Sequence, residues 1–178
     1  MNKVAYENFK SIYLDFNVLT VCVVGLLLFG IYLLILKLEK SKWTKEKLFF
    51  GACWSFYLLI IITSTILNRN LGGDNHIELE LFWSYKEAMN SPDSVIVWQI
   101  LYNVFMFIPW GIFLANKWEC MKKPLWNIGS ALLMSLTIEV IQLIFQCGTV
   151  ELDDVFHNVI GGVTGYSFWR VYYDIKQK

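Results

Sequence analysis

Three pairs of polar side chains stand inside long apolar stretches of the chain, where they could form a binding site or an acid–base centre. They are Gln99 with Asn103, Glu139 with Gln142, and Asp154 with Asn158. The members of each pair are three or four residues apart, so both lie on one face of a helix. A charged side chain at membrane depth costs roughly 2.5 to 3.5 kcal/mol on insertion scales, so such residues indicate a buried interface or a functional site.

The apolar stretches predict about five transmembrane helices. Apolar residues make up 56% of the chain, above the roughly 45 to 50% of soluble proteins. The stretches are long enough to cross a hydrocarbon core of about 30 Å. The predicted spans cover residues 17–36, 48–67, 95–115, 126–146 and 155–173. We therefore predict an all-α, polytopic membrane helix bundle that forms a single domain over residues 1–178.

The positive charges predict the orientation of this bundle. Eleven of the fifteen Lys and Arg residues fall in the loops 37–47 and 117–123 and in the tail 170–178, and four fall on the other side. The positive-inside rule then places the N-terminus outside and the C-terminus in the cytoplasm. In this orientation all three polar pairs lie in the outer half of the membrane.

Charge and cysteine patterns exclude several functions. The formal net charge is zero and no basic cluster lies outside, so the sequence does not indicate nucleic-acid binding. It contains no C-x-x-C and no H-E-x-x-H pattern, and we expect no metal and no cofactor. Cys147 is the lone cysteine on the outer side.

Acidic and aromatic residues beside the spans complete the candidate site. The predicted binding residues are Glu78, Glu80, Trp83, Tyr85, Gln99, Asn103, Glu139, Gln142, Asp153, Asp154, His157 and Asn158.

Most of these residues also have a purely structural interpretation. The four amides Gln99, Asn103, Gln142 and Asn158 could join helices by hydrogen bonds worth about 0.6 to 2 kcal/mol each. Asp153 and Asp154 stand where a helix N-cap is expected, and His157 could be a packed side chain. Trp83 and Tyr85 could belong to the interfacial aromatic belt. Glu139 is the exception, because a carboxylate within a span must be protonated, paired or facing water.

Small residues predict how two of the helices behave. Pro109 and Gly111 are expected to kink the span 95–115, because proline removes a backbone donor. Gly161 and Gly165 form a G-x-x-x-G face, which lets a neighbouring helix backbone approach closely.

Three motifs in order, over residues 103–111, 135–142 and 153–166, resemble those of the VanZ-like family. The stretch 78–85 is similar to the family's outer-loop motif but lacks its proline, and Trp110 stands where leucine is usual. The resemblance implies a bacterial integral membrane protein. The family's namesake is associated with resistance to the glycopeptide antibiotic teicoplanin.

The polar site and the family resemblance are compatible with two classes of function. The first is a non-enzymatic, multi-pass protein of the bacterial cell membrane that contacts membrane lipids. It would bind a lipoglycopeptide or a lipid-linked cell-wall precursor at the outer leaflet. The second is a membrane enzyme that acts on a lipid-linked substrate, with Glu139 or Asp154 as the acid–base residue. Because no G-x-S-x-G nucleophile or zinc signature is present, we expect the binding protein rather than the enzyme. The low helix count and the lack of an inverted repeat argue against a transporter.

Overall fold

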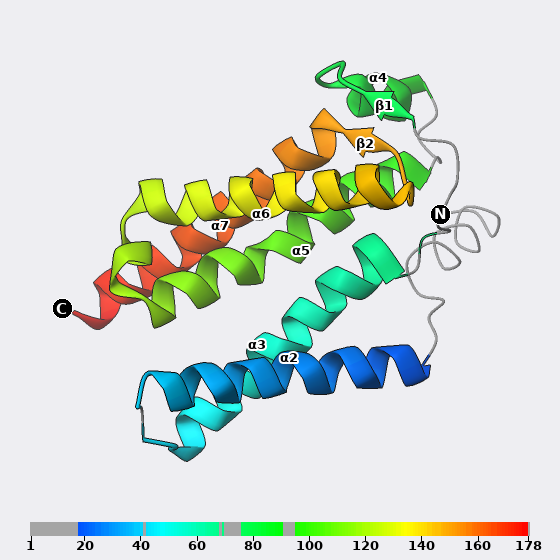
Figure 1. Cartoon of the computed structure of the whole chain (residues 1–178). Helices are drawn as coiled ribbons and strands as arrows, with labels where there is room; N and C mark the ends of the chain where they lie inside the picture. Colours follow the sequence, from blue (N-terminus) through cyan, green and yellow to red (C-terminus); the bar gives the residue numbers. More distant parts are fainter. Residues whose placement is uncertain (1–17, 41, 68, 70–75, 91–94, 178) are drawn as a thin grey trace. The chain divides into compact units, whose positions relative to one another are not determined.

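The computed structural model describes residues 18–40, 42–67, 69, 76–90 and 95–177, and most of them are helical (Figure 1). The chain divides into two compact units, one within residues 11–69 and the other within residues 70–178. The prediction of an all-α helix bundle is confirmed. The prediction of one domain over the whole chain remains a prediction.

The first unit is a pair of helices, α2 (Val18–Leu38) and α3 (Lys45–Ile62), the second extended by the π-helical turn η1 (Thr63–Leu67). Thr44 caps α3, and its side chain accepts a hydrogen bond from the Lys47 amide at 3.3 Å. The Tyr32 hydroxyl of α2 donates to the Lys47 carbonyl at 2.9 Å. A Cβ on Gly51 would lie 2.0 Å from the Tyr32 ring, so glycine makes room for the aromatic side chain.

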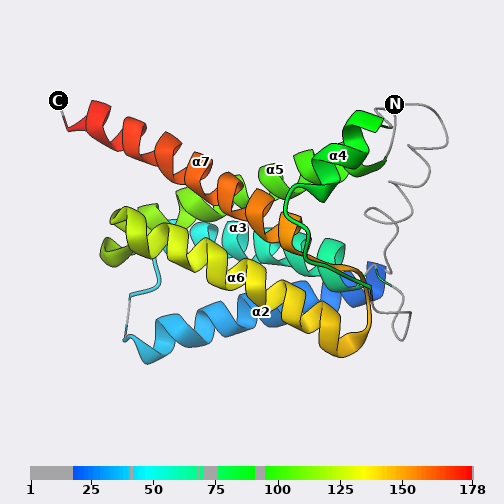
Figure 2. The ribbon, with the colours of Figure 1, turned by 90° about the horizontal axis from the view of Figure 1, so that it is seen from above.

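Three long helices form the second unit. The elements of this unit are β1 (Ile77–Glu78), α4 (Trp83–Asn90), α5 (Val95–Lys117), the 3-10 turn η2 (Glu119–Lys122), α6 (Pro124–Phe145), β2 (Val150–Glu151) and α7 (Leu152–Lys176). Helix α7 packs against both α5 and α6, and Figures 1 and 2 show the three lying together. The two short strands pair in parallel, with Ile77 opposite Val150 and Glu78 opposite Glu151.

The G-x-x-x-G face of α7 meets α5 at backbone contact. A Cβ on Gly161 would lie 2.2 Å from the Val104 carbonyl oxygen, and one on Gly165 would lie 1.9 Å from that of Ile108. On the α5 side, a Cβ on Gly111 would lie 2.2 Å from the carbonyl oxygen of Gly162. The prediction that these small residues permit a close helix approach is confirmed. The crossing fixes the start of α7 beside the first half of α5.

Four helical stretches among the described residues are long and apolar enough to cross a membrane: Leu19–Leu38, Lys45–Leu67, Val95–Lys117 and Pro124–Phe145. Helix α7 has 25 residues, which at 1.5 Å per residue is about 37 Å and long enough to span. It is not one of the four because it is more polar, with Asp153 and Asp154 in its first turn and Arg170 and Asp174 near its end. The fifth span therefore remains a prediction. The sides of the membrane on which the two termini lie also remain a prediction.

Candidate functional site

The three polar pairs belong to segments that meet at one end of the second unit, where α6 ends and α5 and α7 begin (Figure 1). Helix α6 stops at Gln146, whose left-handed backbone (φ 50°) turns the chain. The Cys147 amide then donates to the Gln142 carbonyl at 3.1 Å. The short strand β2 follows and leads directly into α7. These local turns bring the end of α6 and the first turns of α7 into contact.

Asp153 joins the start of α7 to the start of α4. Its carboxylate is fully buried and accepts hydrogen bonds from the amides of Phe82 at 2.6 Å and Ser84 at 2.9 Å. The Ser84 hydroxyl also donates to it, at 2.5 Å. The first N–H groups of a helix have no partner within the helix. Asp153 therefore caps α4 from a position 69 residues away in the sequence.

The predicted role of Asp153 and Asp154 as N-cap of their own helix is wrong. The N-cap of α7 is Glu151, and its side chain makes no capping hydrogen bond. Asp153 and Asp154 lie inside the first turn, where their charge still complements the positive end of the helix dipole. Their carboxylates accept hydrogen bonds from other segments instead.

Phe82 has a strained backbone at the point where it meets Asp153. Its φ of 68° lies in the left-handed region, which is a conformational outlier for a bulky residue. Such a conformation costs of order 1 to 3 kcal/mol and persists only where surrounding contacts enforce it. The hydrogen bond from its amide to Asp153 is one such contact, and the Phe156 ring, 5.2 Å away and perpendicular, is another.

Glu139 and Asp154 hold two further segments in place. The Glu139 side chain, 5% exposed, accepts a hydrogen bond from the Glu151 amide at 2.9 Å. Asp154 accepts one from the Asn103 side-chain amide at 2.6 Å, which joins α7 to α5. Glu139 is thus paired within the protein, as a carboxylate at this depth requires.

Two amino acids of α7 connect it to α6 and α4. The side-chain amide of Asn158 donates to the Ser135 hydroxyl of α6 at 2.8 Å. His157 Nε2 lies 3.0 Å from the Tyr85 hydroxyl of α4. Burial, and then the negative charge of Asp153, raise the pKa of the Tyr85 phenol. The Tyr85 hydroxyl therefore keeps its proton at neutral pH, and it can donate a hydrogen bond to His157 Nε2 in the tautomer that leaves this nitrogen unprotonated.

The remaining candidates are Gln142, Gln99, Glu78, Glu80 and Trp83. Gln142 is buried, and Gln99 is half-buried one turn before Asn103. Glu78 accepts a hydrogen bond from the Glu80 amide at 2.9 Å at the surface, and Glu80 pairs with Lys86. Trp83 is half-buried at the start of α4.

Ser84, Ser135 and the Glu151 amide are parts of the site that the sequence analysis missed. Ser135 could have been found from its spacing, because it lies on the same face of α6 as Glu139 and belongs to a row of five buried residues three or four positions apart. They are Asn127, Ala131, Ser135, Glu139 and Gln142. Nothing in the sequence ties Ser84 to Asp153. The segment from Glu78 to Tyr85 was predicted only as a loop, whereas it forms half of a strand pair and the start of a helix.

Cys147 and the acidic side chains are the groups that thiol or metal chemistry would use here. Cys147, which is predicted to be the lone cysteine on the outer side, is only 1% exposed, so its thiol is buried and not open to reagents. Within the described residues, no group of three or more His, Cys, Asp and Glu side chains is arranged to hold a metal ion. The carboxylates of the centre instead accept hydrogen bonds from backbone and side-chain N–H groups, an arrangement that positions chain segments.

The comparison with known proteins identifies the family. The family model described as VanZ/LLP1 matches residues 23–173, which include α4, α5 and α6 and all of α7 except its last three residues. The chain belongs to the VanZ/LLP1 family. Together with four helices able to cross a membrane, this establishes a VanZ-like membrane protein.

One relative of this VanZ/LLP1 protein is Protein VanZ of Enterococcus faecium, which is 36% identical over 72 residues. The matched region covers 40% of this chain and 44% of the relative, so less than half of either sequence is compared. No solved structure matches the chain.

Proposed function

We propose that this VanZ/LLP1 protein lowers susceptibility to teicoplanin by binding an amphiphile at the outer surface of the bacterial cell membrane. The segment 77–90, which contains β1 and α4, forms the contact surface. The buried polar centre, which we define as Glu139, Asp153, Asp154, His157 and Asn158 with their hydrogen-bond partners, holds that segment in place. The proposal combines the family membership with the character of this segment.

The observation that carries the proposal is the number of apolar side chains exposed on segment 77–90. Leu79 is 68% exposed, Met89 77% and Phe82 44%. The other exposed members of the group are Ile77, Leu81 and Tyr85. Large exposed apolar patches mark interaction or membrane-binding sites. This group belongs to a segment that is joined to β2 and to the start of α7, and we propose that an acyl chain leaving the membrane meets it there.

The polar centre explains why the segment keeps this position. Asp153 caps α4, the His157 ring contacts Tyr85, and the strands β1 and β2 pair through their backbones. Each contact links segment 77–90 to the start of α7. A binding surface held by several buried hydrogen bonds loses less conformational entropy on binding than a mobile loop does.

The chemistry of the drugs supplies a discriminating test. Teicoplanin carries an acyl tail and vancomycin does not, so an apolar contact surface distinguishes them. We expect expression of this chain in a susceptible Gram-positive host to raise the inhibitory concentration of teicoplanin more than that of vancomycin. The Leu79→Ser/Met89→Ser variant should raise the two inhibitory concentrations equally. It removes the apolar contact and leaves the buried side chains of the polar centre intact. Ile175→Ser is the matched control, since Ile175 is 69% exposed at the far end of α7 and should leave the difference unchanged.

Two isosteric variants test the polar centre in the same assay. Glu139→Gln keeps an oxygen that accepts from the Glu151 amide, and Asp154→Asn keeps one for Asn103. Both should leave protein levels nearly normal and reduce the teicoplanin effect, because an amide is a weaker acceptor than a carboxylate and holds its partner segment less firmly. The proposal would be overturned if the wild-type chain raised the inhibitory concentrations of both drugs equally. It would also be overturned if neither concentration changed although the protein was confirmed to be in the membrane. Chemical alteration of a lipid-linked precursor incubated with the purified protein, detected by mass spectrometry, would favour an enzyme instead.

A further inference from the structure

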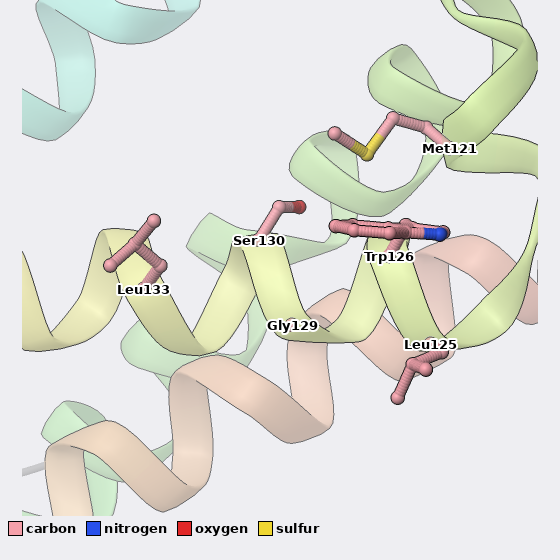
Figure 3. Close-up of a pocket in the computed structure, with 6 residues that line it drawn as sticks. All are labelled: Met121, Leu125, Trp126, Gly129, Ser130 and Leu133. Carbon is pink, nitrogen blue, oxygen red and sulfur yellow. The ribbon is translucent and has the colours of Figure 1, made fainter.

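A groove on α6 lies away from the polar centre, at the beginning of that helix. It has a volume of about 450 Å³. Its lining residues are Met121, Leu125, Trp126, Gly129, Ser130 and Leu133. Figure 3 shows Met121 of η2 extending over Trp126, with Ser130 and Leu133 following along α6. Apart from the Ser130 hydroxyl, which donates to the Asn127 carbonyl at 2.6 Å, the lining side chains are apolar or carry only the indole N–H.

The groove has the length of one membrane leaflet. From Leu125 to Leu133 it follows α6 for about 12 Å at 1.5 Å per residue, against about 15 Å for half of a hydrocarbon core. Trp126, which lines the groove in the first turn of α6, is 59% exposed, and tryptophan is enriched at the membrane–water boundary. An acyl chain aligned with the membrane normal would fit along it.

Positive charge lies at the same end of the groove. Lys122 and Lys123 come directly before α6, and Lys123 is exposed. The Lys122 ammonium lies 2.5 Å from a Glu119 oxygen and 5.3 Å from the centre of the Tyr173 ring. Its charge is therefore partly compensated, whereas Lys123 stands at the surface beside Pro124. A phosphate at this end of the groove would find a cation within the preceding turn.

We propose that this groove binds an anionic glycerophospholipid. One acyl chain lies against Trp126, Gly129 and Leu133, and the phosphate pairs with Lys123. Charge complementarity and leaflet-length apolar lining together select an acidic phospholipid over a zwitterionic one, because each lysine near an anionic headgroup contributes about 1 kcal/mol. The site is separate from segment 77–90 and does not depend on the function proposed for it.

Gly129 offers a way to fill the groove without disturbing the fold. A Cβ at this position would meet no atom within 4 Å, although the residue lines the groove. The Gly129→Leu variant should therefore fold and occupy the space of the acyl chain. Gly30 of α2 also has nothing within 4 Å of an added Cβ, so Gly30→Leu is the matched control.

The test is a titration of the purified full chain in detergent with phosphatidylglycerol and with phosphatidylcholine of the same acyl chains, followed by native mass spectrometry. The wild-type chain should bind phosphatidylglycerol more tightly. Lys123→Gln should weaken that binding about fivefold, the equivalent of one lysine–headgroup contact, and leave phosphatidylcholine binding unchanged. Gly129→Leu should weaken the binding of both lipids, and Gly30→Leu neither.

Equal affinity for the two lipids, or phosphatidylglycerol binding unaffected by both Lys123→Gln and Gly129→Leu, would overturn the proposal. Thermal unfolding of each variant distinguishes a filled groove from a damaged fold. Lys123→Gln changes only an exposed side chain, so its result stands even if Gly129→Leu fails to fold.

Discussion

Buried carboxylates act in this protein as acceptors for N–H groups at the ends of helices and strands. Asp153 accepts from two amides and one hydroxyl at the start of α4, and Glu139 accepts from the amide before α7. The sequence marked Glu139 as unusual, because a charged group at membrane depth needs a partner, and gave Asp153 as a binding candidate or helix N-cap. It did not identify the partners. The Asp153–Ser84 pair spans 69 residues, and no periodic pattern links such distant positions.

Removing Asp153 should therefore destabilise the second unit. In Asp153→Ala, the Phe82 and Ser84 amides lose their acceptor, and each unsatisfied buried donor costs about 1 to 3 kcal/mol. We expect thermal unfolding of the purified protein to occur at clearly lower temperature, and proteolysis within segment 77–90 to accelerate. Asp174→Ala on the same helix is the control, because Asp174 pairs with Arg170 at the surface and such pairs contribute little. If Asp153→Ala and Asp174→Ala lowered the unfolding temperature by similar amounts, Asp153 would not anchor α4.

The crossing of α5 and α7 is the element-scale feature that the sequence predicted best. The G-x-x-x-G spacing of Gly161 and Gly165 marked the contacting face, and the structure shows backbone contact there. The sequence did not say which helix would occupy that face. It also missed β1, β2 and α4, because strands of two residues and a helix of eight are too short to produce a clear periodicity.

Two glycine substitutions in this unit should have opposite effects on stability. Gly165→Ala places a Cβ 1.9 Å from the Ile108 carbonyl oxygen, so the helices must separate, at a cost of typically 1 to 3 kcal/mol. Gly129→Ala meets no neighbouring atom and should stabilise α6, since alanine favours a helix over glycine by about 1 kcal/mol. Thermal unfolding in detergent compares them directly. A stable Gly165→Ala protein would contradict the close approach of α5 and α7.

At the scale of the whole molecule, the placement of charge predicts which end of the second unit faces outward. The loop 117–123 between α5 and α6 carries three lysines, whereas the opposite end holds the buried carboxylates and segment 77–90. The positive-inside rule places the lysine loop in the cytoplasm. Segment 77–90 is then predicted to face the cell exterior, where an antibiotic or a cell-wall precursor is met. Helix number and apolar length predicted the bundle, but orientation in the membrane follows from charge alone.

Cysteine accessibility in intact cells tests this placement most directly. Glu87 is exposed on α4 and Cys120 is exposed in η2, while Cys147 is buried. A membrane-impermeant maleimide should label the Glu87→Cys/Cys120→Ser chain in intact cells. It should label Cys120 of the wild-type chain only after the membrane is permeabilised. The reverse pattern, with Cys120 labelled in intact cells and Cys at position 87 protected, would place segment 77–90 in the cytoplasm and contradict recognition of an amphiphile at the outer surface.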